Sequence, residues 1–324
     1  MTTSTPHATA PAPRSLRERL QPLTVTGTVR IAAWLMLLAQ SGIILTGALV
    51  RLTGSGLGCP TWPKCTPESL TNTPEMGIHG YIEFGNRLLG IALGVLCLVT
   101  VLHLWRLRKD RKDLFVLAVS LLAVVPAQAV IGGITVLTDL NPWSVAIHFI
   151  PSAFAVAASA YFVRRTHDSG RLTGDRAPQK LRILAWVIAV LVLVVVLFGV
   201  LTTGAGPHSG DELSTRNGLD PEIMARLHAW PVWALVIATV VARVLAARAV
   251  AAGTADRALS RTLDVLIGVE ILQGVIGYVQ HFTGLPVTLV ALHMIGVCLV
   301  IAAATAVVDA CYSRAPLPEA PARS

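Results

Sequence analysis

Residues 54–65 read GSGLGCPTWPKC, and residues 79–87, a little further along the chain, read HGYIEFGNR. The first segment is rich in the turn formers Gly and Pro and carries two cysteines, Cys59 and Cys65. The second segment places Glu83 four positions before Arg87, at the start of an apolar run. Long apolar stretches precede and follow both segments, so this part of the chain is expected to be a polar rim between hydrophobic helices.

The composition is that of a membrane protein. Of the 324 residues, 54% are hydrophobic and only 14% are charged, whereas soluble chains carry about 25% charged residues. A run of about 20 apolar residues is long enough to cross the hydrocarbon core as a helix. We therefore expect an all-α polytopic protein with eight membrane spans, at residues 29–50, 86–107, 114–136, 144–164, 181–203, 226–247, 262–281 and 287–311.

Charge is distributed unevenly between the connecting segments. Arg and Lys are concentrated after the second, fourth and sixth expected spans, whereas the other connections are acidic or nearly neutral. By the positive-inside rule, both termini are expected to be cytoplasmic and the segment at 54–87 to face outward. The net charge of +8 is explained by this topology, so no nucleic-acid partner is expected.

Two parts of the chain repeat each other. Gln128 precedes His148 by 20 positions, and Gln273 precedes His293 by the same 20. Four spans separate the copies, so the halves share one orientation in the membrane and are expected to form two pseudo-symmetric four-helix bundles. The expected division is a disordered basic tail at 1–28, a bundle at 29–165, a cytoplasmic linker at 166–180, a second bundle at 181–312 and a tail at 313–324.

Three histidines lie near the outer ends of expected spans: His148, His228 and His293. An ionisable side chain inside a span is costly and usually functional, and three at similar depth favour metal ligation over simple hydrogen bonding. Two histidines on facing helices of an apolar bundle suit a heme better than zinc, which usually takes three or four ligands. We expect His228 and His293 to bind a b-type heme. In the first half His148 has no matching histidine, because Asn86 stands where a partner is expected.

Several polar residues of the outer rim allow more than one interpretation. His79 is a second iron ligand, a proton shuttle or a solvated side chain. Glu83 and Arg87 form a plain salt bridge, or Glu83 accepts a proton or stabilises a carbocation at the cavity edge while Arg87 binds a heme propionate. Arg51 and Arg226 are further propionate candidates, because guanidinium matches carboxylate geometry, or they are interface anchors.

The cysteines fall into two groups. Cys59 and Cys65 lie on the expected outer, oxidising side, where disulfides persist, so we expect a structural or redox-active disulfide. Cys97, Cys298 and Cys311 are expected to be inert packing residues. Glu270, inside the seventh expected span, is a proton-path or a packing carboxyl, and the sequence leaves both open.

Residues 46–65, TGALVRLTGSGLGCPTWPKC, the segment at 82–87, IEFGNR, and the repeated span-end histidines resemble the heme A synthase family. The resemblance implies eight transmembrane helices in two bundles and oxidation of the C8 methyl group of heme O to a formyl group, giving heme A for terminal oxidases. It implies a b-type heme on His228 and His293, a substrate site at His148, and an essential carboxylate at Glu83. It also implies a disulfide between Cys59 and Cys65. Many members carry histidine where this chain has Asn86.

From these features we expect an oxidoreductase of the plasma membrane with heme b as cofactor and heme O as substrate. Expected partners are heme O synthase, oxidase assembly factors, an unidentified electron acceptor or donor, the lipid bilayer and a second copy of the chain. One rival is a quinone-linked diheme electron carrier, which needs two fully ligated hemes. Another is a repeat-built transporter, which needs broken helices or polar residues at mid-membrane. A thiol oxidase leaves the histidines unexplained.

Overall fold

The computed structural model describes residues 15–212 and 214–317. In this part of the chain, eight helices are long and apolar enough to cross a membrane. Each coincides with one expected span, which confirms the all-α, polytopic fold. The eight helices are α2 (Gly27–Leu52), α3 (Gly77–His103), α4 (Lys112–Leu137), α5 (Pro142–Arg165), α6 (Gln179–Ala205), α7 (Pro221–Ala251), α8 (Arg257–Phe282) and α9 (Val287–Ala310).

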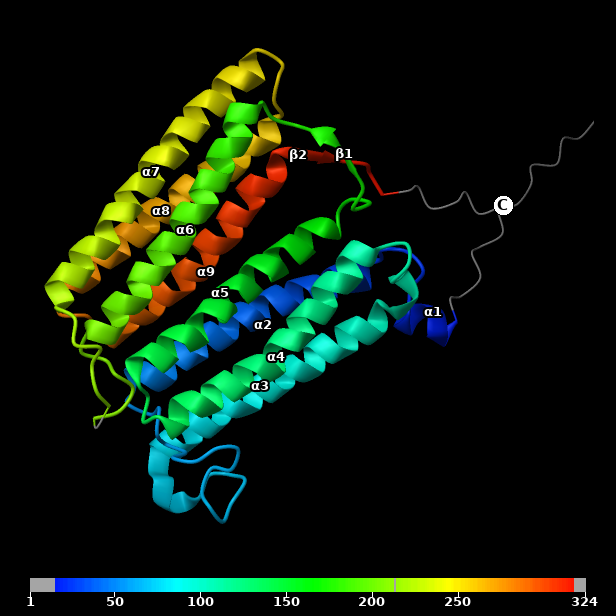
Figure 1. The fold of residues 1–324 in the computed structure, drawn as a ribbon. Coiled ribbons are helices and arrows are strands. Elements are labelled where there is room, and N and C mark those ends of the chain that lie inside the picture. Colours follow the sequence, from blue (N-terminus) through cyan, green and yellow to red (C-terminus); the bar gives the residue numbers. More distant parts are fainter. Residues whose placement is uncertain (1–14, 213, 318–324) are drawn as a thin grey trace, which may run out of the picture.

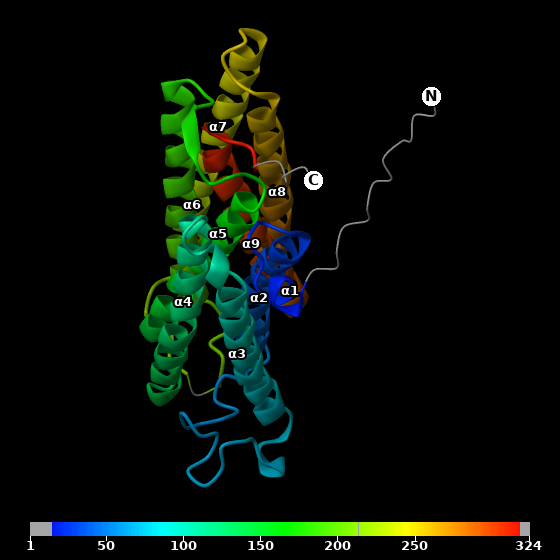
Figure 2. The same cartoon turned by 90° about the vertical axis from the view of Figure 1, so that its right-hand side faces the viewer.

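These helices form two four-helix bundles (Figure 1). Helices α2 to α5 pack in a ring, each against its neighbour in sequence and α2 also against α5, and helices α6 to α9 repeat the arrangement. The two bundles meet where α2 and α5 contact α9 and where α5 contacts α6. The segment between α2 and α3 projects beyond the helices at one end of the molecule (Figure 2).

Several helices begin earlier than their apolar runs predict. Helix α3 begins at Gly77, not near 86, after a 3-10 turn η1 (Pro74–Met76), so His79 and Glu83 are helical. Helix α7 begins at Pro221, where Asp220 caps it by accepting a hydrogen bond from the Ile223 amide at 2.8 Å. A hydropathy criterion finds only the part of a helix that lies in hydrocarbon, whereas polar first turns are stabilised by caps and prolines.

Short elements occupy segments that were expected to be tails or linker. Helix α1 (Leu16–Leu20) lies in the expected disordered tail, whose residues 1–14 are outside the described part. Its Leu20 carbonyl lies 2.6 Å from the His103 ring. Strand β1 (Leu172–Asp175), in the linker, pairs antiparallel with β2 (Tyr312–Arg314). A 3-10 turn, η2 (Trp105–Leu107), follows α3.

The molecule therefore has two distinct ends, which we name the loop end, bearing the α2–α3 segment, and the sheet end, bearing β1 and β2 (Figure 1). The apolar core of each bundle lies toward the sheet end. In the first bundle it runs from Val29 and Leu104 to Leu121, and in the second it includes Leu181 and Leu263. The loop end holds the candidate site residues.

Polar contacts join the bundles at both ends. At the sheet end, the buried carboxylate of Asp309 in α9 accepts hydrogen bonds from Arg165 of α5 at 2.6 Å and from Arg314 at 2.6 Å. At the loop end, Arg51 of α2 donates to the carbonyl of Thr203, in the last turn of α6, at 2.7 Å. It also donates to the carbonyl of His208, just beyond the end of α6, at 2.5 Å. These contacts fix the loop ends of the two bundles side by side.

Candidate functional site

Toward its loop end, each bundle contains long helical segments in which every residue keeps part of its surface accessible. Buried residues recur regularly elsewhere in both bundles. About ten residues correspond to roughly 15 Å of helix, and these loosely covered segments carry the candidate histidines. The segments are residues 84–92, 122–132 and 142–152 in the first bundle and 225–234, 274–282 and 287–295 in the second.

His148 of α5 and His293 of α9 occupy matching places in these segments. The His148 ring lies over Gly132 of α4, where an added Cβ would be 3.2 Å from it, and the His293 ring lies over Gly277 of α8, where the distance would be 3.5 Å. Among the described residues, Nδ1 of each ring is buried without a hydrogen-bond partner. Buried polar atoms are normally paired, so both rings have the character of ligand-binding groups.

A glutamine fixes each of these two helix pairs. Gln128 donates from its amide nitrogen to the His148 carbonyl at 2.9 Å, and Gln273 donates to the His293 carbonyl at 3.0 Å. The repeat seen in the sequence is therefore a repeated contact: the glutamine sets the position of the backbone that carries the histidine, and the glycine one turn further along makes room for the ring.

His228 of α7 is the other candidate ligand of the second bundle. Its Nδ1 lies 3.1 Å from the carbonyl oxygen of Val195 in α6. Because a carbonyl only accepts, Nδ1 carries the proton and Nε2 keeps a free lone pair. Metal-binding histidines are commonly oriented in this way. The ring lies against Gly199, where an added Cβ would be 3.1 Å away.

Asn86 takes the corresponding place in the first bundle. It lies on α3 and its side-chain oxygen accepts a hydrogen bond at 2.8 Å from the Thr46 hydroxyl of α2, so it links α3 to α2 as His228 links α7 to α6. His79 lies two turns earlier on α3, is exposed, and has its Nδ1 2.9 Å from the Ser55 hydroxyl. The structure thus places His79 beside the α2–α3 segment and not beside Asn86.

Cys59 and Cys65 form a disulfide bond, and both are fully buried. We name residues 59–65 the disulfide loop. The loop is attached to α3 through Glu83, which is 6% exposed and accepts a hydrogen bond from the Cys59 amide. Gly58, just before the loop, packs directly on the backbone at His79, so closely that a Cβ would clash.

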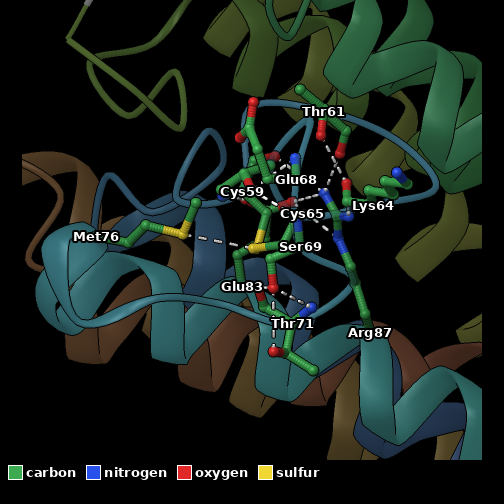
Figure 3. The surroundings of a disulfide bond; sticks show 11 residues. Cys59, Thr61, Lys64, Cys65, Glu68, Ser69, Thr71, Met76, Glu83 and Arg87 are labelled. Atoms are coloured by element: carbon green, nitrogen blue, oxygen red, sulfur yellow. Dashed lines mark hydrogen bonds and ion pairs between the residues drawn. A yellow bond between two sulfur atoms is a disulfide. The ribbon is translucent and has the colours of Figure 1, made fainter.

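Arg87 completes this attachment (Figure 3). Its guanidinium lies 2.5 Å from a Glu83 oxygen and also donates to three loop carbonyls, those of Cys59 at 3.0 Å, Thr61 at 3.1 Å and Lys64 at 3.2 Å. The Glu83–Arg87 pair is therefore more than a surface salt bridge, because it holds the disulfide loop against α3. Glu83, which carries the carboxylate, lies one helical turn before Asn86 on α3.

The three arginines considered for heme propionates are not brought together. Arg87 is held by Glu83 and the loop, and Arg51 by the segment that follows α6. Arg226 is largely exposed and pairs with Glu222 on the same helix. Two positions separate Arg226 from His228, which is about 200° around an α-helix, so Arg226 projects from the other side of α7.

One contact of the site was not anticipated from the sequence. The Trp62 ring of the disulfide loop packs against Gly133 of α4, where an added Cβ would lie 2.5 Å from the indole. Gly133 is next to Gly132, which seats His148. The disulfide loop thus reaches the same turn of α4 that positions the candidate ligand. The paired glycines were visible in the sequence, but nothing in it indicated which aromatic side chain would pack on them.

Residues 30–305, most of the chain, match a family model described as cytochrome oxidase assembly protein. A heme A synthase of Bartonella bacilliformis is 25% identical over 252 residues, which cover 66% of this chain and 69% of that protein. Heme A synthases of Staphylococcus epidermidis and Geobacillus thermodenitrificans are each 29% identical, over 58% and 41% of this chain. The matched regions span 66% of the Staphylococcus protein and 42% of the Geobacillus protein.

Proposed function

Since the chain belongs to the heme A synthase family, we propose that it is an oxidoreductase that converts the C8 methyl group of heme O into a formyl group, producing heme A for terminal oxidases. The observation that carries this proposal is the repeated seating of histidines on glycines at the loop end of each bundle, together with the buried Nδ1 atoms of His148 and His293, which have no partner among the described residues.

We assign the substrate heme O to the first bundle because its set of iron ligands is incomplete. His148 offers one imidazole, while Asn86 takes the place that His228 takes in the second bundle. An amide is a poor iron ligand, so this bundle suits a molecule that must be bound, converted and released. His148 and Glu83 are the proposed catalytic residues, and Arg87 is a proposed positioning residue.

The second bundle fits a resident b-type heme. His228 and His293 would hold it, since Nε2 of His228 keeps its lone pair and Nδ1 of His293 is buried without a partner in the described part of the chain. Such a cofactor supplies one-electron redox capacity next to the substrate bundle. Arg51 and the contacts at the sheet end hold the two bundles together.

Glu83 is proposed to serve the chemistry of the methyl group. Conversion of a methyl to a formyl group adds one oxygen atom, derived from water or dioxygen, and passes four electrons to an acceptor. Protons leave the methyl carbon in this oxidation, and a fixed carboxylate can accept a proton or stabilise developing positive charge. Arg87 and the Cys59 amide hold the Glu83 carboxylate in place. The disulfide loop thereby positions the proposed base and, through Trp62, borders the turn that seats His148.

We further propose that the protein is a multi-pass plasma-membrane protein whose loop end faces outward. The connections at the sheet end contain the basic clusters, and the disulfide is at the opposite end, as the positive-inside rule and the redox environment require. Both termini are then cytoplasmic. Proposed partners are heme O synthase, oxidase assembly factors and an unidentified electron acceptor, and the chain is proposed to self-associate.

The test is an absorption spectrum and an extracted-heme analysis of the purified protein and two variants. The wild type should contain heme b together with heme O or heme A. Glu83→Ala should keep heme b but yield no formyl heme, whereas Glu75→Ala, which removes an exposed glutamate of η1, should behave like the wild type. Two hemes b per chain without heme O or A would instead indicate an electron carrier, and a protein without heme would favour a transporter.

A further inference from the structure

A buried carboxyl group in the second bundle has no part in the site described above. Glu270 of α8 is 6% exposed. Its Oε1 accepts a hydrogen bond from the Thr239 hydroxyl of α7 at 2.8 Å, and its Oε2 is buried without a partner among the described residues. Arg243, one turn beyond Thr239, pairs with Asp264 instead, at 2.5 Å. A carboxyl group inside a membrane span is costly and marks a function by default.

The position of Glu270 connects it to the proposed heme ligands. Glu270, Gln273 and Gly277 lie at i, i+3 and i+7, which places them on one face of α8. Gln273 donates to the His293 carbonyl at 3.0 Å, and Gly277 lies under the His293 ring. Glu270 is therefore one helical turn from the residue that fixes the helix carrying His293.

The first bundle shows that the scaffold does not require a carboxyl group at this place. The pairs Gln128 and Gln273, Gly132 and Gly277, and His148 and His293 are each 145 positions apart and make matching contacts. The residue 145 positions before Glu270 is Val125. It is partly buried and packs against the apolar core of the first bundle. A valine thus satisfies the packing, and the carboxyl group is an addition found in the second bundle.

We infer that Glu270 is a proton-binding site coupled to the redox state of the heme proposed on His228 and His293. The Glu270 carboxylate takes up one proton from water when the proposed heme is reduced by one electron, and it releases that proton when the heme is oxidised again. Charges interact strongly in the low-dielectric interior of the bundle. Proton uptake is therefore favoured on reduction, because it keeps the net charge of this interior constant. The inference rests on the proposed function only in requiring a heme in the second bundle.

Few other groups can account for such coupling. Between residues 227 and 242, α7 carries His228 as its single titratable side chain, and before Asp309 α9 carries His293 and Cys298. The two histidines are the proposed ligands. Helix α8 itself also carries Asp264, which is paired with Arg243, and Tyr278 and His281 near its loop end, while α6 carries no titratable side chain after Arg182. Glu270 is therefore the buried carboxyl group without a charged partner in the described helices α6 to α9 that surround the proposed heme.

The test is the midpoint potential of the b-type heme, measured by dithionite titration of the purified holoprotein at a series of pH values. In the wild type the potential should fall as pH rises, with a slope approaching ~59 mV per tenfold change in proton concentration over the range in which Glu270 titrates. Glu270→Gln and Glu270→Val, the second of which restores the residue of the first bundle, should lose this slope. Asp264→Asn should keep it. Equal slopes in the wild type and both Glu270 variants would overturn the inference.

A second measurement does not depend on the variants retaining heme. Infrared difference spectra of the wild type, reduced minus oxidised, should show the C=O stretch of a protonated carboxylic acid that shifts in D₂O. The absence of that band would also overturn the inference. A wild-type protein without b-type heme would contradict the proposed function instead, so the two failures are distinguishable.

Discussion

At the scale of single residues, each candidate iron ligand is a histidine whose ring lies on a glycine of the preceding helix. His148, His228 and His293 lie over Gly132, Gly199 and Gly277 respectively. A side chain at any of these glycines would occupy the volume of the ring. The glycines therefore contribute to the site by the absence of a Cβ, and they set how far each imidazole reaches into the bundle interior.

Gly277→Val should displace the His293 ring and weaken binding of the b-type heme. A Cβ at this position would already lie 3.5 Å from the imidazole, and valine adds two methyl groups. We expect affinity to fall by about 10–100-fold, as for other changes that misorient a ligand, measured as heme b per chain. Gly274→Val is the matched control, since a Cβ there meets nothing within 4 Å. Equal heme content in both variants would argue against His293 as a ligand.

At the scale of elements, the disulfide loop is held by three different kinds of contact. The Cys59–Cys65 bond closes it, Arg87 and Glu83 attach it to α3, and Trp62 packs it on α4. The loop therefore bridges α3 and α4 near the turn of α4 that carries Gly132 and Gly133. Any loosening of the loop is expected to affect the first bundle before the second bundle.

Cys65→Ser should loosen the disulfide loop. A disulfide that closes a ring of this size restricts the unfolded chain, so its loss is expected to lower the free energy of unfolding by about 2 kcal/mol. We expect faster tryptic cleavage after Lys64, which is exposed in the loop, together with reduced formyl production. Heme b in the second bundle should be unchanged. Cys97→Ser, at a buried free cysteine of α3, is the control, and unchanged cleavage after Lys64 would show that the disulfide does not order the loop.

At the scale of the whole molecule, the two bundles are joined by buried charge at the sheet end. Asp309, 5% exposed, contacts Arg164 at 2.5 Å and Arg165 at 2.6 Å, and Arg165 is itself 2% exposed. The Arg165 guanidinium also lies 4.8 Å from the centre of the Tyr161 ring. Arg314 of β2 also contacts Asp309, at 2.6 Å, and β2 pairs with β1 of the linker, so the linker and the C-terminal segment are tied to this cluster.

Asp309→Asn should destabilise the whole protein. The substitution leaves the buried Arg165 charge without its main partner, and breaking a buried pair in this way costs about 3–5 kcal/mol. We expect a lower melting temperature in detergent. Asp264→Asn, whose pair with Arg243 is largely exposed, should cost roughly 0–1 kcal/mol. Equal melting temperatures for the two variants would show that the cluster does not hold the bundles together.

The sequence alone determined the eight spans and the duplicated bundles. These features follow from local free energies: the transfer of about 20 apolar residues into hydrocarbon fixes a span, and a repeated spacing such as that of Gln128 and His148 repeats the same contact. The disulfide between Cys59 and Cys65 was also predictable, because the positive-inside rule placed this segment on the expected oxidising side.

Only the tertiary structure decided which groups these residues contact. Arg87 was a candidate for binding a propionate, but it holds the disulfide loop. Thr46 pairs with Asn86, and β1 pairs with a distant C-terminal strand. Such partners are brought together by the packing of helices that are far apart in sequence. A membrane span is selected by its own composition, whereas a polar contact depends on which neighbour the folded bundle provides.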